Sequence, residues 1–304
     1  MLTIFVPSYN HAKYITKTLN KILSINIPNK RVYVVDDFSS DDSVEVVRNY
    51  IKQNDTRNEI DFVCKEENKG VVDSLNVFLE KCTTDYIYLM SSDDIVVPEN
   101  VLELFGIISS EPKLKYVIGG ANNLILDGRE TPVYKKQHDL FFGLSETDRF
   151  NELYLNSPSP ILSQGTIIRK EALIAIGGWD SDIIADDYSM FLRLLSLYPR
   201  NGHDFLFLPD IICVKYRHHD TNSYTKTLRQ FLMTTQVLRK YAPKNIKNEA
   251  IARKFGYYLA VSIRDLNFSA AKGILGASNF NDIALGLYYS VLLILKRLVN
   301  KCTR

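Results

Sequence analysis

The chain begins with LTIFVPSYN at residues 2–10 and continues, after a segment of helical period, with RVYVVDDFSSD at residues 31–41. Each stretch starts with β-branched and aromatic residues and ends with polar ones, which is typical of a buried strand and the loop that follows it. The segment between them places Ile15, Leu19 and Ile22 on one face of a helix. Together they predict a βαβ unit with two parallel strands.

The same alternation of strand and helix continues along the first half of the chain. Strand-like runs recur at 60–63 and 86–90, and each is followed by apolar residues at helical spacing. This pattern predicts an α/β fold with a largely parallel sheet that helices cover on both faces. The polar, proline-bearing stretch from Asp127 to Pro160 breaks the pattern, and we interpret it as a mobile connection.

Further strands and helices are expected beyond this connection. Strands are predicted at 165–168, 205–208 and 212–216 and a helix at 187–198, and the signal is helical from Thr227 to the end. We therefore divide the chain into an α/β part, residues 1–224, and a helical extension, residues 225–304. A length of 304 residues is consistent with about two domains.

Composition and charge exclude several classes of protein. With 46% hydrophobic and 24% charged residues, the chain is neither disordered nor a many-span membrane protein. The net charge of +2 conceals −9 on residues 1–224, with 23 basic and 32 acidic residues, and +11 on residues 225–304, with 14 and 3. The acidic first part disfavours a nucleic-acid partner, and the basic extension favours an anionic surface.

The cysteines and the N-terminus indicate the compartment. The four cysteines form no Cys-x-x-Cys pair and are too few for a disulfide framework, so a reducing cytosol is expected and a structural zinc site is not. The strand-like run that starts at Leu2 leaves no room for a signal peptide. We expect a cytoplasmic protein.

A run of thirteen residues, 283–295, is apolar and precedes Lys296 and Arg297. It is shorter than the roughly 20 residues that span a bilayer. Two interpretations stay open: a helix lying in a membrane interface, or a core or dimer helix. The basic extension favours peripheral contact with the inner face of the cytoplasmic membrane.

Polar residues cluster where the predicted strands end. In an open parallel sheet, ligands bind beyond the carboxyl ends of the strands. The four loops there read PSYNH at 7–11, DDFSSD at 36–41, EENKG at 66–70 and SSDD at 91–94. Such residues are common in any turn, but adjacent carboxylates repel one another unless a cation or hydrogen-bond donors neutralise them. The loops predict one ligand site.

These four loops, together with GGWD at 177–180, DDY at 186–188 and YRHH at 216–219, resemble the successive signatures of family 2 glycosyltransferases with the GT-A fold. The resemblance covers about residues 2–223 and is to bacterial enzymes of cell-surface polysaccharide synthesis. It implies a Rossmann-like nucleotide-binding sheet with helices on both faces. It also implies a nucleotide-sugar half to about residue 126 and an acceptor half at 127–224.

The resemblance assigns roles to the loop residues. Tyr9 would stack on uracil and Asp37 would accept a hydrogen bond from its N3–H, since a base with one imide donor requires a planar ring and an acceptor. Asp36 would support the turn. The other residues implied to bind the nucleotide are Pro7, Asn68, Gly70, Ser92 and Asp93. For Tyr9 and Asn68, purely structural roles at the sheet edge and in a turn stay open.

A nucleotide diphosphate needs a divalent cation, and the resemblance implies Mn²⁺ or Mg²⁺ held by Asp93 and His219. The family motif is commonly Asp-x-Asp, but its first acid is Ser91 here. The motif therefore supplies at most one direct carboxylate, which argues against tight metal binding without nucleotide. Arg217 is implied as a phosphate partner, and His218 remains an alternative to His219.

Asp187 is implied to be the general base that deprotonates the acceptor hydroxyl, with Asp186 orienting or capping the helix that follows. A single base with no carboxylate nucleophile implies inversion at the anomeric carbon. A mere N-cap is the structural alternative for this pair. Trp179 would either stack on an acceptor sugar or simply pack.

The implied function is transfer of a sugar, from a UDP-sugar, to a hydroxyl of a growing glycan such as capsule, O-antigen or lipooligosaccharide. A lipid-linked acceptor also fits this function. One alternative is a nucleotidyltransferase, although no glycine-rich phosphate loop follows the first strand, where Pro7 to Asn10 stand instead. The other is a non-catalytic GT-A-like protein that only binds a glycan or nucleotide.

Overall fold

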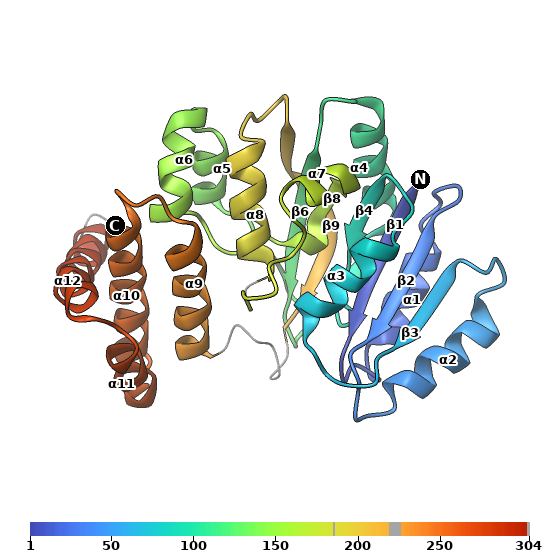
Figure 1. Ribbon diagram of the computed structural model, residues 1–304, viewed down its shortest axis with the longest axis horizontal. Coiled ribbons are helices and arrows are strands. Elements are labelled where there is room, and N and C mark those ends of the chain that lie inside the picture. Colours follow the sequence, from blue (N-terminus) through green and yellow to red (C-terminus); the bar gives the residue numbers. More distant parts are fainter. Residues whose placement is uncertain (185, 219–225, 303–304) are drawn as a thin grey trace.

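The computed structural model describes residues 1–184, 186–218 and 226–302 (Figure 1). It is an α/β structure with a central sheet and a group of helices at the C-terminal end, as the sequence predicts. The strands are β1 (Leu2–Ser8), β2 (Arg31–Asp36), β3 (Ile60–Cys64), β4 (Tyr86–Leu89), β5 (Ile95–Val96), β6 (Tyr116–Leu124), β7 (Glu130–Pro132), β8 (Thr166–Arg169) and β9 (Phe205–Arg217). The first helices are α1 (Ile15–Leu23), α2 (Ser43–Asn54), α3 (Val71–Lys81) and α4 (Pro98–Ser110).

The remaining helices follow α4 in the chain. They are α5 (Lys136–Phe142), α6 (Glu146–Leu155), the 3₁₀ turn η1 (Ser163–Gly165), α7 (Lys170–Ala175), α8 (Asp186–Leu197), α9 (Thr227–Tyr241), α10 (Lys247–Arg264), α11 (Phe268–Gly276) and α12 (Phe280–Cys302). The helix predicted at 187–198 is thus confirmed as α8 within one residue at each end.

Within the described residues, the strands form one sheet in the order β3-β2-β1-β4-β8-β6-β9-β5, and β7 pairs with β6. Strands β1 to β4 are parallel, as predicted. The second half is mixed, because β8 runs antiparallel to both β4 and β6. The parallel pairing predicted from the first part of the chain therefore does not extend to β8. The reason is that η1 brings the chain to the carboxyl end of β4, so β8 must run back along it.

Strand β6 is absent from the sequence prediction because Gly119 and Gly120 lie at its centre, and glycine normally weakens a strand. These glycines are needed because β9 passes close beside them, with register shifts at this point. A Cβ on Gly120 would overlap the Pro209 carbonyl, and one on Gly119 would lie 2.8 Å from Sγ of Cys213. The two extended runs predicted at 205–216 consequently form the single, irregular strand β9.

Residues 127–160 are more ordered than the sequence predicts. They form β7, α5 and α6, and the helices bury Phe141, Phe142, Leu153 and Tyr154 in the main core. The interpretation as a mobile connection is wrong, because apolar residues in two short helices escape a search for long periodic segments. Residues 157–160 lie outside regular helix, as their prolines require.

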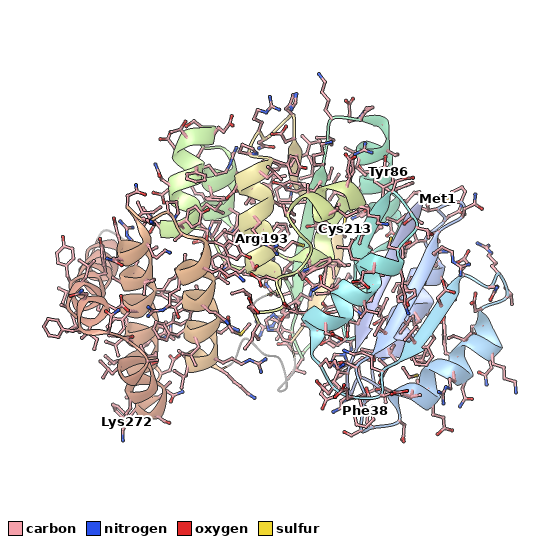
Figure 2. All side chains as sticks on the ribbon, viewed as in Figure 1. Met1, Phe38, Tyr86, Arg193, Cys213 and Lys272 are labelled. Atoms are coloured by element: carbon pink, nitrogen blue, oxygen red, sulfur yellow. The ribbon has the colours of Figure 1, made fainter. Side chains whose placement is uncertain are left out.

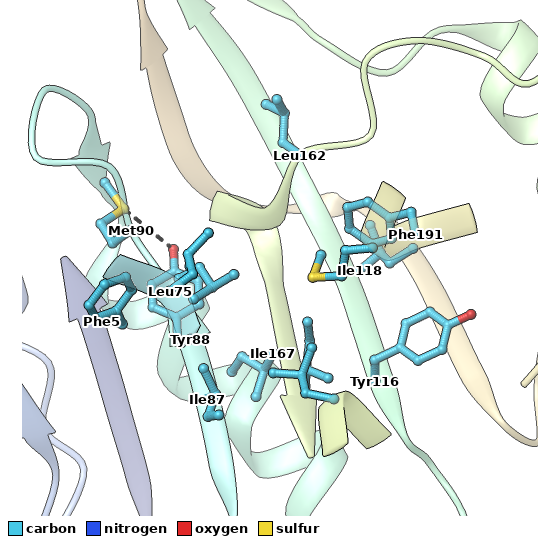
Figure 3. Packing of buried hydrophobic residues seen from close by; sticks show 14 of the residues in the cluster. Phe5, Leu75, Ile87, Tyr88, Met90, Tyr116, Ile118, Leu162, Ile167 and Phe191 are labelled. Carbon is cyan, nitrogen blue, oxygen red and sulfur yellow. Dashed lines mark hydrogen bonds between the residues drawn. The ribbon is translucent and has the colours of Figure 1, made fainter. Parts of the chain in front are cut away.

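The core fills both sides of the sheet, and Figure 1 shows α3 in front of the parallel strands and α1 behind them. Figure 2 shows the side chains on the ribbon, and Figure 3 shows Phe5, Tyr88 and Ile167 among the buried side chains that project from neighbouring strands. Tyr88 is fully buried and donates its hydroxyl proton to the Gln164 carbonyl at 2.6 Å. The core thereby fixes η1 against the carboxyl end of β4.

The helices predicted from Thr227 onward are confirmed. α10 and α12 approach closely, since a Cβ on Gly256 would lie 2.7 Å from the Gly286 carbonyl oxygen. Phe231, Phe255, Leu259 and Ile274 form a second, smaller core among these helices. The apolar run 283–295 lies within α12. Among the described residues, no helix combines the length and the apolar character needed to cross a membrane.

Candidate active site

The turn after β2 is built around Asp36. Its carboxylate is fully buried and accepts hydrogen bonds from the Ser39 amide at 2.8 Å and the Ser39 hydroxyl at 2.7 Å. Phe38, at the turn, adopts a φ of +63° and is exposed. The geometry of Asp36 matches the supporting role inferred for it from the sequence.

Asp37 joins the end of β2 to the start of α3. Its two carboxylate oxygens accept hydrogen bonds from the amides of Lys69 at 3.1 Å and Gly70 at 2.7 Å, and Lys65 forms an ion pair with it at 2.5 Å. Gly70 has φ +85° and ψ 168°, a conformation essentially restricted to glycine. A Cβ at Gly70 would meet nothing within 4 Å, so the space beside this backbone is open.

The loop after β1 is tied to the same turn. The Asn10 side-chain oxygen accepts a hydrogen bond from the Ser40 backbone N–H at 2.8 Å, and the Asn10 backbone N–H donates to the Ser39 hydroxyl at 2.9 Å. Tyr9, beside Asn10, exposes 45% of its surface. Asn68 is exposed in the loop before α3. The three loops therefore border one open edge of the sheet.

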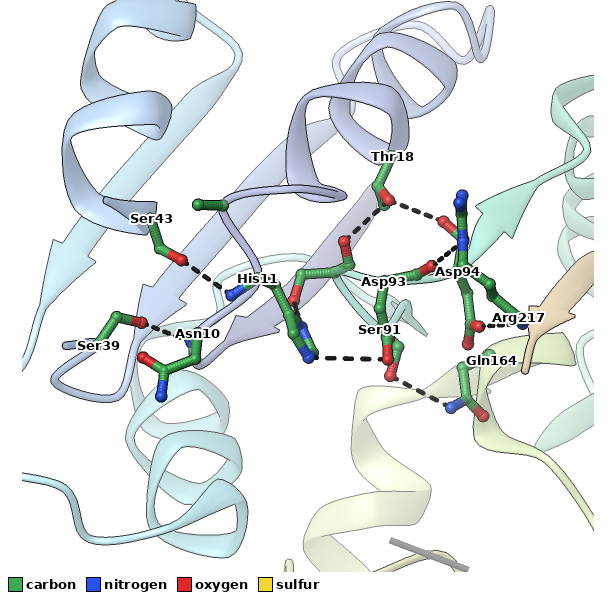
Figure 4. A network of polar contacts seen from close by, with 12 residues as sticks. Asn10, His11, Thr18, Ser39, Ser43, Ser91, Asp93, Asp94, Gln164 and Arg217 are labelled. Atoms are coloured by element: carbon green, nitrogen blue, oxygen red, sulfur yellow. Dashed lines mark hydrogen bonds and ion pairs between the residues drawn. The ribbon is translucent and has the colours of Figure 1, made fainter. Parts of the chain in front are cut away.

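The loop after β4 carries Ser92 and Asp93, and His11 contacts both. Figure 4 shows His11 beside Asp93. His11 Nδ1 lies 2.6 Å from the buried Ser92 hydroxyl, and Nε2 lies 3.7 Å from Oδ2 of Asp93. Asp93 itself is largely buried, with 9% exposed. A histidine from the first loop thus orients the residues that the sequence assigns to the metal and nucleotide.

Arg217, the last residue of β9, holds the same loop from the other side. Its amide donates to Oδ1 of Asp94 at 2.8 Å and its Nε donates to the Asp93 carbonyl at 2.8 Å. Its guanidinium lies over the Tyr14 ring at 5.0 Å. Burial and then the charge of Asp93 raise the pKa of Asp94 well above its usual value, although Arg217 opposes the shift. These contacts make Arg217 an anchor of the loop.

The short segment η1 connects this loop to Asp187. Gln164 donates from Nε2 to the Ser91 hydroxyl at 3.4 Å, and the neighbouring Ser163 amide donates to Oδ2 of Asp187 at 3.4 Å. Asp187 is half-buried at the start of α8. Its negative charge also contributes to the raised pKa of Asp94. The carboxylate predicted to be the base therefore lies across η1 from the predicted metal loop.

Other predicted site residues lie elsewhere or outside the described residues. Trp179 is only 3% exposed and packs in the core, while its backbone is bonded to the Asn76 side chain on both its N–H and C=O. The structure shows the Trp179 ring packed in the core and not open to stack on a sugar. We therefore leave Trp179 out of the proposed acceptor site. His219 and the side chain of Asp186 lie outside the described residues. His218 is described, and its Nε2 lies 2.8 Å from the Asn123 amide oxygen.

The donor set for a cation is small. Among the described residues, no group of three or more His, Cys, Asp or Glu side chains comes together. Asp93 supplies one hard carboxylate in the loop after β4. These residues fit a divalent cation whose remaining ligands come from the diphosphate of a bound nucleotide.

A sequence profile described as Glycosyl transferase family 2 matches residues 3–177, more than half of the chain. The chain belongs to this family. The prediction from the loop motifs is confirmed, and the family identifies an α/β enzyme class that transfers sugars. The match includes the first four loops of the site and ends at Gly177, before Asp187.

A curated relative is the poly-beta-1,6-N-acetyl-D-glucosamine synthase of Staphylococcus aureus strain COL. It is 25% identical over 193 residues, which are 64% of this chain and 45% of the relative. The chain thus aligns with less than half of that protein's length.

Solved structures confirm the GT-A fold. Residues 1–349 of Staphylococcus aureus TarS, in complex with UDP-GlcNAc, match with a TM-score of 0.62 and 16% identity over 91% of this chain and 80% of that one. The mannosyltransferase PcManGT from Pyrobaculum calidifontis, in complex with GDP-Man and Mn²⁺, matches with a TM-score of 0.58 and 17% identity over 99% and 87%. At these identities the likeness concerns the fold.

Sequence reasoning missed the roles of His11 and Gln164. His11 directly follows the first loop motif, so its position near the nucleotide site was readable. Its partner Ser92 is 81 residues away, however, and Gln164 is 73 residues from Ser91. Only the fold brings these pairs together.

Proposed function

We propose that this chain transfers a sugar from a UDP-sugar to a hydroxyl of a growing cell-surface glycan, with inversion at the anomeric carbon. The observation that carries the proposal is the position of η1. Its residue Gln164 contacts the Ser91 hydroxyl, and its residue Ser163 contacts Asp187. This arrangement supports a role for Asp187 as a base beside the loop that would hold the nucleotide diphosphate. Substrate held between them would gain from proximity and alignment.

The donor side of the proposed site is the open edge bordered by the first three loops. Tyr9 offers a half-exposed ring for the uracil, and Asp37 lies at the turn where the N3–H would be read. Pro7, Asp36, Asn68, Gly70 and Ser92 complete this side. Oδ2 of Asp37 accepts one backbone hydrogen bond, from Gly70, and has a second lone pair for a ligand, whereas Oδ1 already interacts with both the Lys69 amide and Lys65.

On the diphosphate side, Asp93 and His219 would hold Mn²⁺ or Mg²⁺. Such a cation neutralises the phosphate oxygens and stabilises the UDP leaving group. His11 and Arg217 keep Asp93 in place from two directions. The Mn²⁺ in the PcManGT complex supports a divalent cation in this fold.

On the acceptor side, Asp187 takes the proton from the attacking hydroxyl. The Ser163 amide donates to Oδ2 of this carboxylate and holds it beside η1. Asp186 begins α8 and would orient or cap it. Because one base suffices for direct displacement, the product anomer is inverted.

A thermal-shift screen tests the proposed donor site. We expect UDP and one UDP-sugar to raise the melting temperature of the purified chain in the presence of Mn²⁺, and GDP, CMP and dTDP to have little effect, because a ligand that binds only the native state stabilises it. Absence of a shift with every nucleotide would favour a non-catalytic binding protein instead.

We also propose that residues 1–224 carry the chemistry and that residues 225–304 hold the protein at the cytoplasmic face of a membrane. Large apolar side chains are exposed around α11 and α12: Leu266 by 73%, Phe268 by 69%, Phe280 by 83% and Tyr288 by 58%. The +11 charge of the extension complements anionic lipids. Together these features fit peripheral binding.

Vesicle flotation tests this placement. A variant with Phe268→Glu and Phe280→Glu should lose binding to phosphatidylglycerol vesicles, because both exposed rings would be replaced by repelled carboxylates. Leu126→Glu, at a side chain that is 80% exposed in the α/β part, is the matched control and should float as the wild type does. If the double variant floats normally and a dimer dissociates instead, the surface is a partner interface.

A further inference from the structure

The first half of α9 and the loop before α8 enclose a groove of about 580 Å³. Its apolar lining is Ile184, Leu228, Leu232 and Met233, and the cations Lys226 and Arg229 also line it. Ile184 is 56% exposed and Leu232 is 45% exposed, so the apolar surface is accessible. The volume is within the ordinary range for a small-molecule site.

The groove lies next to the proposed base. Ile184 precedes Asp187 by three residues. Figure 1 shows α8 and α9 with their amino-terminal ends directed downward, as are the carboxyl-terminal ends of β1 and β9. A molecule in the groove would therefore be close to the acceptor side of the site.

The two walls of the groove are fastened to each other. Gln236 of α9 donates from Nε2 to the Asp182 carbonyl at 2.5 Å, and Lys240 forms ion pairs with Asp180 at 2.6 Å and Asp182 at 3.0 Å. Tyr241 also donates its hydroxyl proton to Asp180. Burial alone would raise the pKa of Asp180, but hydrogen bonds from Lys240, Tyr241 and the Asp182 backbone lower it. Asp180 is therefore charged at neutral pH. The groove is preformed.

The charged side chains that line the groove are both positive. The sequence of α9 contains no Asp or Glu. In the part of the chain that the structure describes, neither Lys226 nor Arg229 has a carboxylate partner. An apolar channel lined by two unneutralised cations complements an amphiphile that has a hydrocarbon chain and an anionic head. A neutral peptide would leave both cations without a counter-charge.

We propose that the groove binds the phosphate-linked hydrocarbon chain of a lipid that carries the acceptor glycan. The hydrocarbon packs on Leu228, Leu232 and Met233, the phosphate pairs with Lys226 and Arg229, and the sugar hydroxyl reaches Asp187. This assignment rests on the proposed function and specifies its acceptor: a lipid phosphate that extends from the membrane-facing helices into the site.

Calorimetric titration of the full chain tests the proposal, with decyl phosphate below its micelle concentration, decanol and inorganic phosphate as probes. We expect decyl phosphate to bind more tightly than either of the others. A variant with Lys226→Gln and Arg229→Gln should lose about tenfold or more in affinity for decyl phosphate. Leu232→Asp and Ile184→Asp, both at exposed positions that the fold tolerates, should abolish binding. Leu140→Asp, at a side chain 63% exposed on α5, is the control and should bind normally.

The controls separate failure of the groove from failure of the proposed function. Every variant should keep the melting-temperature shift with UDP and Mn²⁺, because the donor loops are untouched. Decyl phosphate binding that is unaffected by the groove variants overturns the proposal, as does equal binding of decanol or of inorganic phosphate alone. Loss of the UDP shift in the wild-type chain, with lipid phosphate binding intact, would contradict the proposed function and not the groove.

Discussion

Replacement of Asp187 by Asn is expected to lower the rate of sugar transfer by about 10²- to 10⁴-fold, the usual contribution of a general base. The amide keeps the size of the side chain but cannot accept the proton of the acceptor hydroxyl. The affinity for UDP should hardly change, because Asp187 lies at the start of α8, across η1 from the nucleotide loops. Turnover of the donor and a UDP titration on the same preparation measure the two effects.

A matched control for this variant is Asp139→Asn. It makes the same chemical change at an exposed side chain on α5 that belongs neither to the loops nor to the groove. We expect it to retain transfer activity. A large loss of UDP affinity in Asp187→Asn would show that this carboxylate belongs to the donor site and that the base lies elsewhere.

Replacement of Asp93 by Asn is expected to weaken Mn²⁺-dependent UDP binding by about 10- to 100-fold, a range typical of damage to a metal site. The loss should be large because the described residues provide no cluster of other ligands that could replace this carboxylate. UDP titrations with Mn²⁺ and with a chelator distinguish metal-dependent from metal-independent affinity. Only the former should fall.

Asp85→Asn is the matched control for Asp93, because Asp85 is 74% exposed and pairs only with the N-terminal amine in the described structure. Its UDP titrations should equal those of the wild type. If Asp93→Asn gives wild-type titrations with and without Mn²⁺, Asp93 is not a ligand, and its contacts with His11 and Arg217 serve only the loop.

The position of the first loops at one edge of the sheet was largely predictable from sequence because their signals are local. In the parallel half of the sheet each strand is directly followed by its loop. The motifs PSYN, DDFSSD and SSDD therefore indicate both where a strand ends and which polar side chains lie there. The parallel pairing of β1 to β4 then brings the loops together without further information. The support of the turn by Asp36 follows from the same local logic.

The acceptor half was less predictable because its determinants are non-local. Gly119 and Gly120 look like strand breakers until β9 is placed against them. α5 and α6 are too short for a strong periodic signal, and their burial depends on packing against the main core. The sequence around Trp179 does not reveal whether its ring faces a sugar or the core. Its backbone hydrogen bonds with Asn76, 103 residues away, accompany its burial. Only the folded chain distinguishes these cases.

The stereochemistry of the released sugar tests the central claim most directly. The full chain is incubated with Mn²⁺ and the α-linked UDP-sugar that gives the largest melting-temperature shift, and proton NMR follows the first sugar formed before its anomers equilibrate. Direct displacement with Asp187 as the single base predicts UDP release and an initial β-anomer. An initial α-anomer, or no consumption of any nucleotide sugar, would contradict the account.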